Sequence, residues 1–451
     1  MGKKNHREGL LFDRRGFLEA MAAGVGMVGG WAAVGRWAAA ESAGETPLSP
    51  GGPGTAPAAT PSLAVPGAAS NPALAEPAGP VGGRKIKLGL VGQGGRGRWI
   101  ARLFQKHGGY QIAAVADYFP EVADQAGEEF GVDKKYRFSG LKGYQKVIDS
   151  GVEAIVLKTP PCFFPDHAKA AVEAGVHVYM AKPVAVDVPG CLAIQEAGQQ
   201  ATRKNRVFLV DYQMPTDPVN QKVAEVIRSG QLGPLARVST VGISGGHNDP
   251  PKTATIASRL RGLIWDNDIP LGGGFIVSFD IHAIDVAVWV LGRRPTAATG
   301  ACRIARPEPR GGDSPDVFSV IFEYEDGLLH DHWSQHLPNR TPGEISMKAF
   351  TYTGHAVINY WGNSGYEIRG QKRVEAAVEN LYEAGAVRNI AHFYKAILEG
   401  PYDNPTVARA VYGCLTCILG REACLRGRRL TMAELLAEKK HLPLDLTGLV
   451  E

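Results

Sequence analysis

A glycine-rich turn that follows a short apolar segment is the first chemical signal in the 451-residue sequence. The turn consists of Gly92, Gln93, Gly94, Gly95, Arg96 and Gly97. The apolar segment, 85–91, has the composition of a buried strand, and a helical pattern follows the turn through Phe104. Glycines let the chain turn tightly and bring backbone N–H groups close to a phosphate, and a helix N-terminus attracts an anion. The segment therefore predicts a binding site for the diphosphate of a dinucleotide.

A carboxylate lies where the second half of such a site requires one. The strand predicted over 112–116 ends in Asp117, 20 residues after Gly97. At that place a carboxylate accepts hydrogen bonds from both hydroxyls of an adenosine ribose and repels a 2′-phosphate. Because the three residues after Asp117 include no arginine, we expect NAD rather than NADP.

Further polar residues follow two later strands. The strand over 154–157 leads to Thr159–Pro160 and to His167 at the head of an alanine-rich helix, and the strand over 177–180 leads to Lys182. In an open parallel sheet the carboxyl ends of the strands line the ligand crevice. We therefore expect these polar residues beside the nicotinamide.

These motifs are similar in order and spacing to those of the Gfo/Idh/MocA family, which includes glucose-fructose oxidoreductases and inositol dehydrogenases. The likeness extends from residue 85 to about residue 428, and its C-terminal part resembles an exported bacterial branch. The matching segments are Gly92–Gly97, Asp117, Thr159–Pro160, His167, Ala181–Pro183, Gly272–Gly274, Ser278, His282, Asp285 and 380–386.

The resemblance implies an α/β fold with an N-terminal Rossmann dinucleotide-binding domain. It also implies a C-terminal α+β domain with an open, mostly antiparallel sheet, and a homo-oligomer, because such sheets commonly pair with another subunit. The sequence agrees, since segments of strand composition recur in its second half and Asp326–Gly327 is a hairpin signal. The segments are 237–243, 317–324, 329–333, 345–352 and 356–360. Asn404 with Pro405 and Thr431 with Glu434 predict two later helix starts.

For catalysis, the resemblance implies the oxidation of a secondary alcohol by His282 and Lys182. His282 would act as the base, because an imidazole titrates near neutral pH and this position matches the family's catalytic histidine. Lys182 would donate a hydrogen bond to the substrate hydroxyl, and a positive nicotinamide nearby would depress its pKa. A histidine among apolar residues is also typical of a protein core, and a Lys-Pro pair of a surface turn, so these alternatives stay open.

Two positions depart from the family pattern. Ala181 stands where the family usually has Glu, and Ser278 stands where it has Asp. The side chains that could face a substrate are Tyr212, Gln213, Ser278, Asp280 and Asp285, with His247, His330 and His332 as further polar groups. His330 and His332 share one face of a strand. Because no third ligand has suitable spacing, we expect no metal.

The residues before 84 are expected to lie outside the fold. Residues 1–40 combine a basic stretch ending in Arg14 and Arg15 with an apolar run and small residues for cleavage, which resembles a twin-arginine export signal. A membrane anchor is the alternative. Residues 41–83 are rich in Pro, Ala and Gly and predict a disordered linker. We expect the twin-arginine machinery to deliver the protein to the periplasm or outside the cell.

We place the Rossmann domain over 84–211 and the α+β domain, with its C-terminal helices, over 212–451. The formal net charge is +4, and residues 1–40 hold six basic against three acidic side chains, so the folded part lacks the basic excess of a nucleic-acid-binding protein. Six cysteines are too few for a disulfide scaffold. Cys414 and Cys417 lie in an apolar helical pattern, which favours core thiols over a metal or redox site.

Three functions are consistent with these observations. The leading hypothesis is an exported NAD(H)-dependent oxidoreductase that transfers a hydride between nicotinamide and a hydroxyl-bearing carbon of a sugar, polyol or sugar derivative. The second is an NAD-dependent glycoside hydrolase, because some exported relatives of the family eliminate a glycoside through transient oxidation. The third is a non-catalytic sugar-binding or assembly protein, which the changes at Ala181 and Ser278 motivate.

Overall fold

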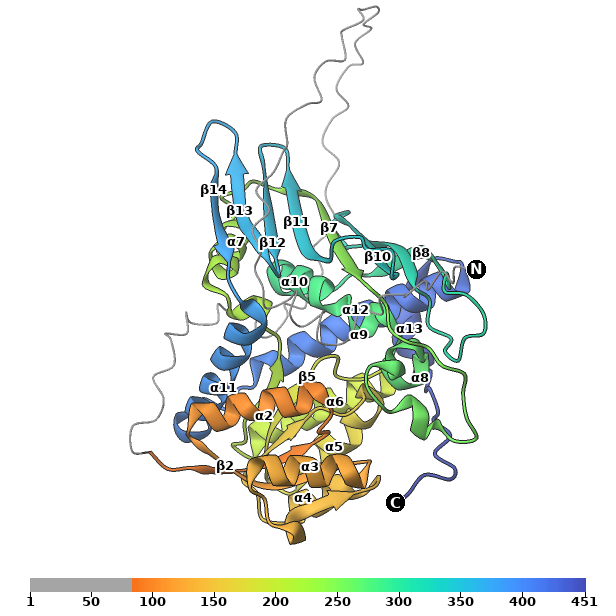
Figure 1. Ribbon diagram of the computed structural model, residues 1–451. Coiled ribbons are helices and arrows are strands. Elements are labelled where there is room, and N and C mark those ends of the chain that lie inside the picture. Colours follow the sequence, from red (N-terminus) through yellow and green to blue (C-terminus); the bar gives the residue numbers. More distant parts are fainter. Residues whose placement is uncertain (1–82) are drawn as a thin grey trace, which may run out of the picture. The chain divides into compact units, whose positions relative to one another are not determined.

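The computed structural model describes residues 83–451. The predicted export signal, 1–40, and the predicted linker as far as residue 82 lie outside the described residues. Two sheets organise the described part of the chain, one parallel and one mixed (Figure 1).

The parallel sheet has six strands in the order β3-β2-β1-β4-β5-β6, and every neighbouring pair is parallel. Its strands are β1 Ile86–Val91, β2 Tyr110–Asp117, β3 Arg137–Ser139, β4 Ala154–Leu157, β5 His177–Ala181 and β6 Phe208–Asp211. Its helices are α2 Gly95–His107, α3 Pro120–Phe130, α4 Gly143–Asp149, α5 Phe164–Glu173 and α6 Val188–Arg203. The predicted strands and the Rossmann-type sheet are confirmed. Because the strand order reverses between β1 and β4, their carboxyl ends open the crevice where such folds bind ligands.

A helix from the C-terminal part of the chain covers part of this sheet. Helix α11 (Leu381–Glu399) packs on α2. Its residues Ile390 and Phe393 join Phe104 and Tyr179 in one apolar cluster. The rings of Tyr179 and Phe393 meet edge to face with their centroids 5.5 Å apart. The core of the N-terminal domain is therefore completed by residues from near the end of the chain.

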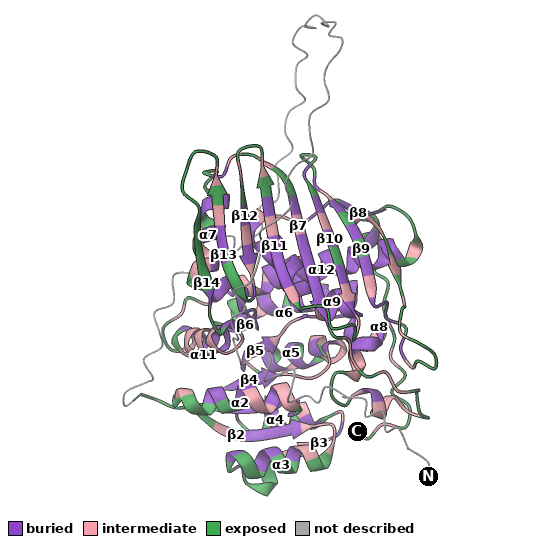
Figure 2. Cartoon of the chain, turned by 45° about the horizontal axis from the view of Figure 1, so that its top comes forward, coloured by how far each residue is buried: buried purple, intermediate pink, exposed green. Residues whose placement is uncertain are grey.

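The mixed sheet has nine strands in the order β14-β13-β12-β11-β7-β10-β9-β8-β15. Its strands are β7 Leu235–Ser244, β8 Ala297–Arg303, β9 Val317–Glu323, β10 Leu329–His336, β11 Glu344–Thr351, β12 Gly354–Asn359, β13 Gly362–Ile368, β14 Val374–Val378 and β15 Leu430–Thr431. All neighbours are antiparallel except β7 and β10. Buried and exposed residues alternate along β9 and β10 (Figure 2), so one face of these strands packs inward. The five predicted strands and the hairpin at Asp326–Gly327 are confirmed.

Helices cover the inner face of the mixed sheet, with α10 on β7 and β11 and α12 on β8 and β9. The helices of this part are α7 Pro218–Arg228, α8 Ile269–Gly272, α9 Phe275–Ser278, α10 Ile281–Leu291, α12 Pro405–Arg426 and α13 Met432–Glu438. Short 3-10 helices are η1 Lys134–Tyr136, η2 Pro161–Phe163, η3 Met214–Thr216, η4 Ile256–Arg259 and η5 Ile264–Asn267. Because α12 also packs on α6, one long helix contacts both layers.

The two predicted helix starts differ in how they are built. The capping box of Thr431 and Glu434 is confirmed at the start of α13. Asn404 is at the N-cap position of α12 and Pro405 is its first residue, so this helix start is confirmed, but the Asn404 side chain makes no capping hydrogen bond. Its side-chain oxygen instead accepts a hydrogen bond from the backbone N–H of Phe208, the first residue of β6. The asparagine therefore joins α12 to the parallel sheet.

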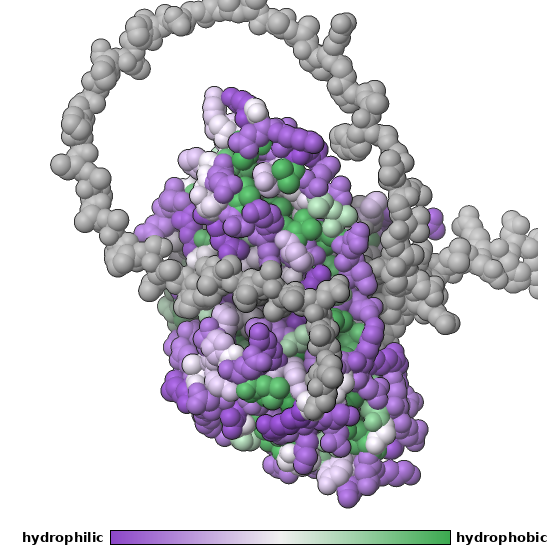
Figure 3. Space-filling model, turned by 90° about the vertical axis from the view of Figure 1, so that its left-hand side faces the viewer, coloured by the Kyte–Doolittle hydropathy of each residue, from purple (hydrophilic) through white to green (hydrophobic). Residues whose placement is uncertain are grey.

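The described residues have the surface and interior of a packed protein. Hydrophilic side chains predominate on the face shown in Figure 3, with hydrophobic ones gathered in smaller patches. All six cysteines are free thiols, and Cys414 and Cys417 are buried. Within residues 83–451 no single helix has the length and hydropathy to span a membrane, and only the bent pair Ile269–Ser278 with Ile281–Leu291 passes that test. The same residues contain no cluster of three or more His, Cys, Asp or Glu side chains arranged for a metal.

A buried arginine on α12 joins the two loops that border the crevice. Arg421 is 1% exposed. Its Nη1 donates hydrogen bonds of 2.9 Å to the main-chain oxygens of Val186, after β5, and Gly273, before α9. Its charge is balanced by Glu422 at 3.1 Å. Arg421 thus fixes the spacing between the segments that carry the predicted catalytic residues.

Replacing Arg421 with Met is expected to lower the free energy of unfolding by about 3 kcal/mol, since it keeps the side-chain bulk but removes a buried charge and two loop contacts. Denaturant unfolding measures this change. Arg428→Met is the control, because Arg428 forms an exposed ion pair with Glu434 and should cost less than about 1 kcal/mol. Equal losses for the two variants would contradict the assigned role of Arg421.

Candidate active site

The turn between β1 and α2 has room for a diphosphate. Gly92 has φ +84°, and a Cβ there would lie 2.6 Å from the main chain of Lys158. A Cβ on Gly97 would lie 1.9 Å from the Gly92 oxygen, whereas a Cβ on Gly94 would meet no atom within 4 Å. The N-terminus of α2 has no side-chain cap and no acidic residue in its first turn. An uncapped helix end beside open space fits the diphosphate of NAD.

Asp117 lies at the end of β2 and holds this turn. Its carboxylate accepts hydrogen bonds from the backbone N–H groups of Gln93 at 2.7 Å and Phe119 at 3.1 Å. Burial raises the pKa of Asp117, and these two hydrogen bonds oppose the shift. The carboxylate is partly exposed and therefore able to meet a ribose.

An arginine that the local sequence did not predict also reaches this end of the crevice. Arg261 lies over the ring of Phe119, with 3.6 Å between its guanidinium carbon and the ring centroid, and pairs with Glu121. It comes from a loop of the second domain, 142 positions beyond Phe119 in the chain. The residues next to Asp117 in the sequence could not predict Arg261, because only the fold brings the two segments together.

Thr159, Pro160 and His167 follow β4 as predicted. The Oγ1 of Thr159 lies 3.4 Å from Nδ1 of His167, which is 6% exposed. Burial lowers the pKa of His167 to about 3, so its ring is neutral and packs on Tyr144 with 4.0 Å between centroids. His167 thus supports Thr159 from behind, while Thr159 and Pro160 border the crevice.

A group of buried charges lies at the strand ends, and two of its members, Lys158 and Asp211, were not predicted from the sequence. Lys158 Nζ lies 3.0 Å from Asp211 Oδ2, and Arg96 Nη2 lies 3.4 Å from the same oxygen. Asn389 on α11 donates to the other oxygen of Asp211 at 3.0 Å. Burial lowers the pKa of Lys158 to about 8 despite the attraction of Asp211. Burial raises the pKa of Asp211, but the two cations prevail and hold it at about 2, so Asp211 is an anion that balances the cations of the crevice.

Lys182 is hydrogen-bonded to the segment that carries His282. Lys182 Nζ donates a 2.5 Å hydrogen bond to the main-chain oxygen of Ser278, one turn before His282. Burial lowers the pKa of Lys182 to about 8. Burial lowers the pKa of His282 well below its usual value. The positive charge of Lys182 lowers this pKa further and is the largest contribution from a charged group. The hydrogen bond to Ser278 therefore joins Lys182 to the segment that carries His282.

The imidazole of His282 is not committed to a structural hydrogen bond. Its Nδ1 has no hydrogen-bond partner among residues 83–451. Its ring lies against Tyr360, with centroids 5.5 Å apart and planes at 73°. The Tyr360 hydroxyl lies 3.5 Å from the side-chain oxygen of Gln213, which brings this predicted substrate residue to the same side. A half-buried, neutral and unpaired imidazole is suited to accept a proton.

Two other predicted substrate residues, Ser278 and Asp280, are buried. Ser278 is 4% exposed, and its hydroxyl has no partner within residues 83–451. Asp280 is fully buried, with its oxygens 3.2 Å from His332 Nε2 and 3.1 Å from His336 Nε2. Burial raises the pKa of Asp280 but these histidines lower it to about 2, so this carboxylate is an internal counterion rather than a group facing the crevice.

Tyr212 and Asp285 lie in the packing between α10 and α12. Asp285 is 3.3 Å from Arg409 Nε, and Arg409 lies over the Tyr212 ring at 5.2 Å. Burial raises the pKa of Asp285 to about 6. The prediction that these two side chains face a substrate does not match this placement, because the helix periodicity that put Asp285 near His282 also turns it toward the neighbouring helix.

Family models match both halves of the folded chain. Residues 86–212 match the "Oxidoreductase family, NAD-binding Rossmann fold" model of GFO/IDH/MocA, and residues 220–350 match the "GFO/IDH/MocA C-terminal domain". The chain therefore belongs to the Gfo/Idh/MocA family of NAD-binding oxidoreductases. The family and its cofactor, as expected from the sequence, are confirmed.

Individual proteins show the same relation. The inositol 2-dehydrogenase of Rhizobium meliloti is 25% identical over 244 residues, which span 54% of this chain and 66% of that protein. The aldose-aldose oxidoreductase of Caulobacter crescentus has a similar fold, with TM-score 0.60, 21% identity and coverage of 77% of this chain and 100% of that one. A levoglucosan dehydrogenase in complex with NADH and levoglucosan gives TM-score 0.64 at 18% identity, again over 77% and 100%.

Gly94→Ala is expected to lower NAD affinity about tenfold or more without loss of stability. The φ of −62° at Gly94 suits alanine, but the new methyl group would project into the space of the diphosphate. Calorimetric titration with NAD and thermal unfolding measure the two effects. Gly97→Ala is the comparison and should lose both binding and stability, whereas unchanged NAD binding by Gly94→Ala would show that the diphosphate lies elsewhere.

Proposed function

We propose that this protein oxidises a hydroxyl-bearing carbon of a sugar, polyol or sugar derivative, with NAD as the hydride acceptor. The observation that carries the proposal is the hydrogen bond that joins Lys182 to Ser278, in the segment that carries His282, at the same end of the parallel sheet as the glycine turn. The relatives named for inositol and levoglucosan support a polyhydroxylated substrate. The match covers just under two thirds of the inositol dehydrogenase. The proposed substrate class therefore depends on the residues of the site as well as on this relative.

Gly92–Gly97 and Asp117 would hold NAD at its diphosphate and adenosine ribose. When bound, the cofactor supplies the acceptor for the hydride that leaves the carbinol carbon. Lys182, as an ammonium, donates a hydrogen bond to the hydroxyl oxygen and stabilises the negative charge that develops there. His282 accepts the hydroxyl proton, so that the C–H pair of electrons can leave and the C=O bond can form. In the reverse direction the same two groups return the proton.

The full-length protein should carry NAD or bind it, and should reduce it with at least one member of a panel of myo-inositol, levoglucosan and D-glucose. Lys182→Met and His282→Ala are expected to lower kcat by about 10²- to 10⁴-fold with NAD affinity nearly unchanged. Wild-type kcat/KM should fall as the pH rises through about 8, because Lys182 loses its proton there. It should hold at mildly acidic pH, because His282 stays neutral below its usual pKa.

Several results would contradict this proposal. The absence of nucleotide binding would remove it, and activity that survives both substitutions would favour a non-catalytic role for these residues. Release of sugar from aryl glycosides without accumulation of NADH would assign hydrolysis in place of net oxidation.

We also propose export by the twin-arginine route, on the basis of the sequence around Arg14 and Arg15. In a Gram-negative host the wild-type protein should reach the periplasmic fraction, and the variant with Arg14→Lys and Arg15→Lys should stay in the cytoplasmic fraction. Fractionation with immunoblotting measures the distribution. Arg36→Lys is the matched control, since it makes the same change outside the pair, and equal export of all three proteins would contradict the proposal.

Self-association is a further expectation from the family. The outer face of the mixed sheet exposes large apolar side chains, among them Ile321 (44%), Trp333 (42%) and Phe350 (37%). Exposed apolar residues on a broad sheet support pairing with another subunit.

A further inference from the structure

The active site lacks the two carboxylates that the family usually places around the lysine and the histidine. Ala181 and Ser278 occupy those positions. The Ser278 main-chain oxygen already accepts the Lys182 hydrogen bond. Sugar recognition needs hydrogen-bond acceptors as well as donors, because each hydroxyl can do both. A further acceptor must therefore come from the surrounding loops.

Asp266, on η5, is such an acceptor. It is 4% exposed, and its Oδ2 lies 3.1 Å from Nε2 of His247. Its Oδ1 is buried and has no hydrogen-bond partner within residues 83–451. A buried, unsatisfied carboxylate oxygen is costly unless a ligand or water completes it.

Contacts with the parallel sheet bring Asp266 to the crevice. Helix η5 packs on α8, and α8 packs on η2, the turn directly after Thr159 and Pro160. Burial lowers the pKa of Lys182, and Asp266 is the largest charge that opposes this shift. The carboxylate therefore favours the charged form of Lys182.

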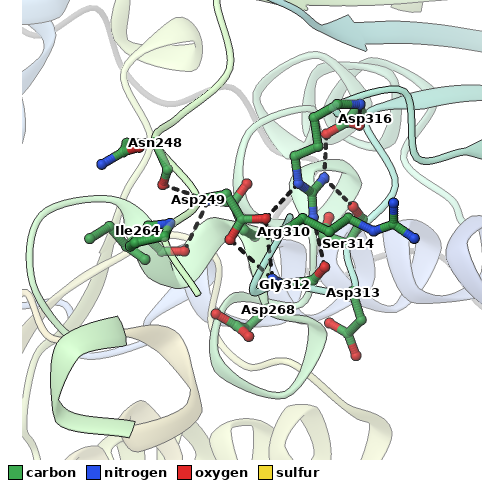
Figure 4. A network of polar contacts seen from close by, with 12 residues as sticks. Asn248, Asp249, Ile264, Asp268, Arg310, Gly312, Asp313, Ser314 and Asp316 are labelled. Carbon is green, nitrogen blue, oxygen red and sulfur yellow. Dashed lines mark hydrogen bonds and ion pairs between the residues drawn. The ribbon is translucent and has the colours of Figure 1, made fainter. Parts of the chain in front are cut away.

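The loop that carries Asp266 is held by two arginines, of which one is fully buried. We call residues 245–268 the clamped loop. Arg259 is fully buried and binds Asp249 at 2.7 Å and Asp268 at 2.6 Å. Arg306 binds the other oxygen of Asp249 at 2.7 Å and also pairs with Asp316. Asp249 and Asp316 lie in one network of polar contacts (Figure 4). Charge-assisted hydrogen bonds at both ends of the clamped loop restrict its movement.

Smaller contacts orient the two side chains of the pair. The Asn267 amide donates to the main-chain oxygens of Asn248 and Ile264 at 3.1 and 3.2 Å. The His247 ring stacks on Phe275, with centroids 5.6 Å apart and planes at 21°. His247 and Asp266 are thus fixed relative to one another, and the free oxygen of Asp266 is a preorganised acceptor.

Resting on the proposed function, we propose that Asp266 binds a second substrate hydroxyl, adjacent to the one held by Lys182, and that the substrates are vicinal diols. An ammonium donor beside a carboxylate acceptor matches the two neighbouring hydroxyls of such a diol. His247 is a positioning residue, which orients the carboxylate through its Oδ2. Asp266 in this chain supplies the carboxylate that positions 181 and 278 do not.

The first test compares a diol with its deoxy analogue. For the panel member that is oxidised fastest, the analogue lacking one hydroxyl beside the oxidised carbon is assayed with the full-length protein and NAD. Asp266→Ala should lower kcat/KM about 10- to 100-fold for the parent sugar and less than about 3-fold for the best deoxy analogue. Asp266→Asn, which keeps the shape and one acceptor, should restore part of the loss. An equal loss on both substrates, or none, would overturn the proposal.

The control is Asp313→Asn, close to the clamped loop. Asp313 accepts a hydrogen bond from the backbone N–H of Ile269, which an asparagine oxygen can also accept. This variant should retain the wild-type ratio of parent to deoxy activity. Thermal unfolding of every variant separates a loss of recognition from a loss of folded protein.

A second test needs no substrate. Acetylation of Lys182 by acetic anhydride is followed by peptide mass spectrometry across a pH series. The groups that face Lys182 are Asp266 and Asp211, which raise its pKa, Arg96 and Lys158, which lower it, and the ring of His282. Asp266→Asn should shift half-maximal labelling to lower pH, and Asp313→Asn should not.

The two tests separate failure of the inference from failure of the proposed function. An unshifted labelling profile would overturn the role of Asp266 whether or not a substrate is found. Absence of NAD binding and of oxidation across the panel would remove the proposed function, and with it the diol assignment, even if labelling shifts as expected.

Discussion

One hydrogen bond joins the two halves of the active site, from the Lys182 amine after β5 to the main-chain oxygen of Ser278 at the end of α9. A carbonyl at the end of a helix lacks an intrahelical partner and carries partial negative charge, so it is a natural acceptor for an ammonium. The bond connects the parallel sheet to the helices beneath the mixed sheet. Because His282 follows Ser278 by four positions, the same contact ties Lys182 to the segment that carries the imidazole. The buried Arg421 reinforces this arrangement by binding the loops on both sides.

Several buried positive charges lie together at the crevice, and they need nearby anions to remain charged. Arg96, Lys158 and Lys182 all lie at the carboxyl ends of the parallel strands, where the anions Asp211 and Asp266 oppose them. Removing cations from water favours their neutral forms, and this is why burial brings the pKa of both lysines to about 8. Asp211 keeps the group stable by pairing directly with Lys158. The same low polarity strengthens any hydrogen bond that Lys182 offers to a substrate.

The mixed sheet uses histidines for a different purpose. Asp280 lies between His332 and His336, and these in turn contact Thr240 and Ser244 at 3.1 and 2.6 Å. The chain of contacts satisfies polar groups that the inner face of the sheet would otherwise bury without partners. It explains why β10 carries histidines at alternate positions without a metal site among the described residues. His282 differs from His332 and His336, because its Nδ1 has no hydrogen-bond partner among residues 83–451 and no ion pair with Asp280.

The sequence by itself determined the features that depend on spacing within one segment. The glycine turn, Asp117 at a strand end and Lys182 after β5 could be predicted because a strand, a tight turn and a helix follow one another without a break. The strands of the mixed sheet followed from their alternation and from the turn at Asp326–Gly327. The orientation of α10 could not be predicted, because the sequence shows that Asp285 is three positions after His282 but not which neighbouring helix the Asp285 side chain faces.

Only the tertiary structure decided which distant residues meet. Lys158 and Asp211 are 53 positions apart, Arg261 reaches Phe119 from another domain, and Asp266 depends on a loop held by Arg259 and Arg306. None of these pairs leaves a local pattern, because their members are far apart in the sequence and only the packing of the sheets and helices brings them together. Where such charges are buried, each needs its counterion beside it to offset the cost of leaving water. Local sequence patterns thus determined the dinucleotide-binding fold, and the packing of the two domains determined which charged side chains lie at its active site.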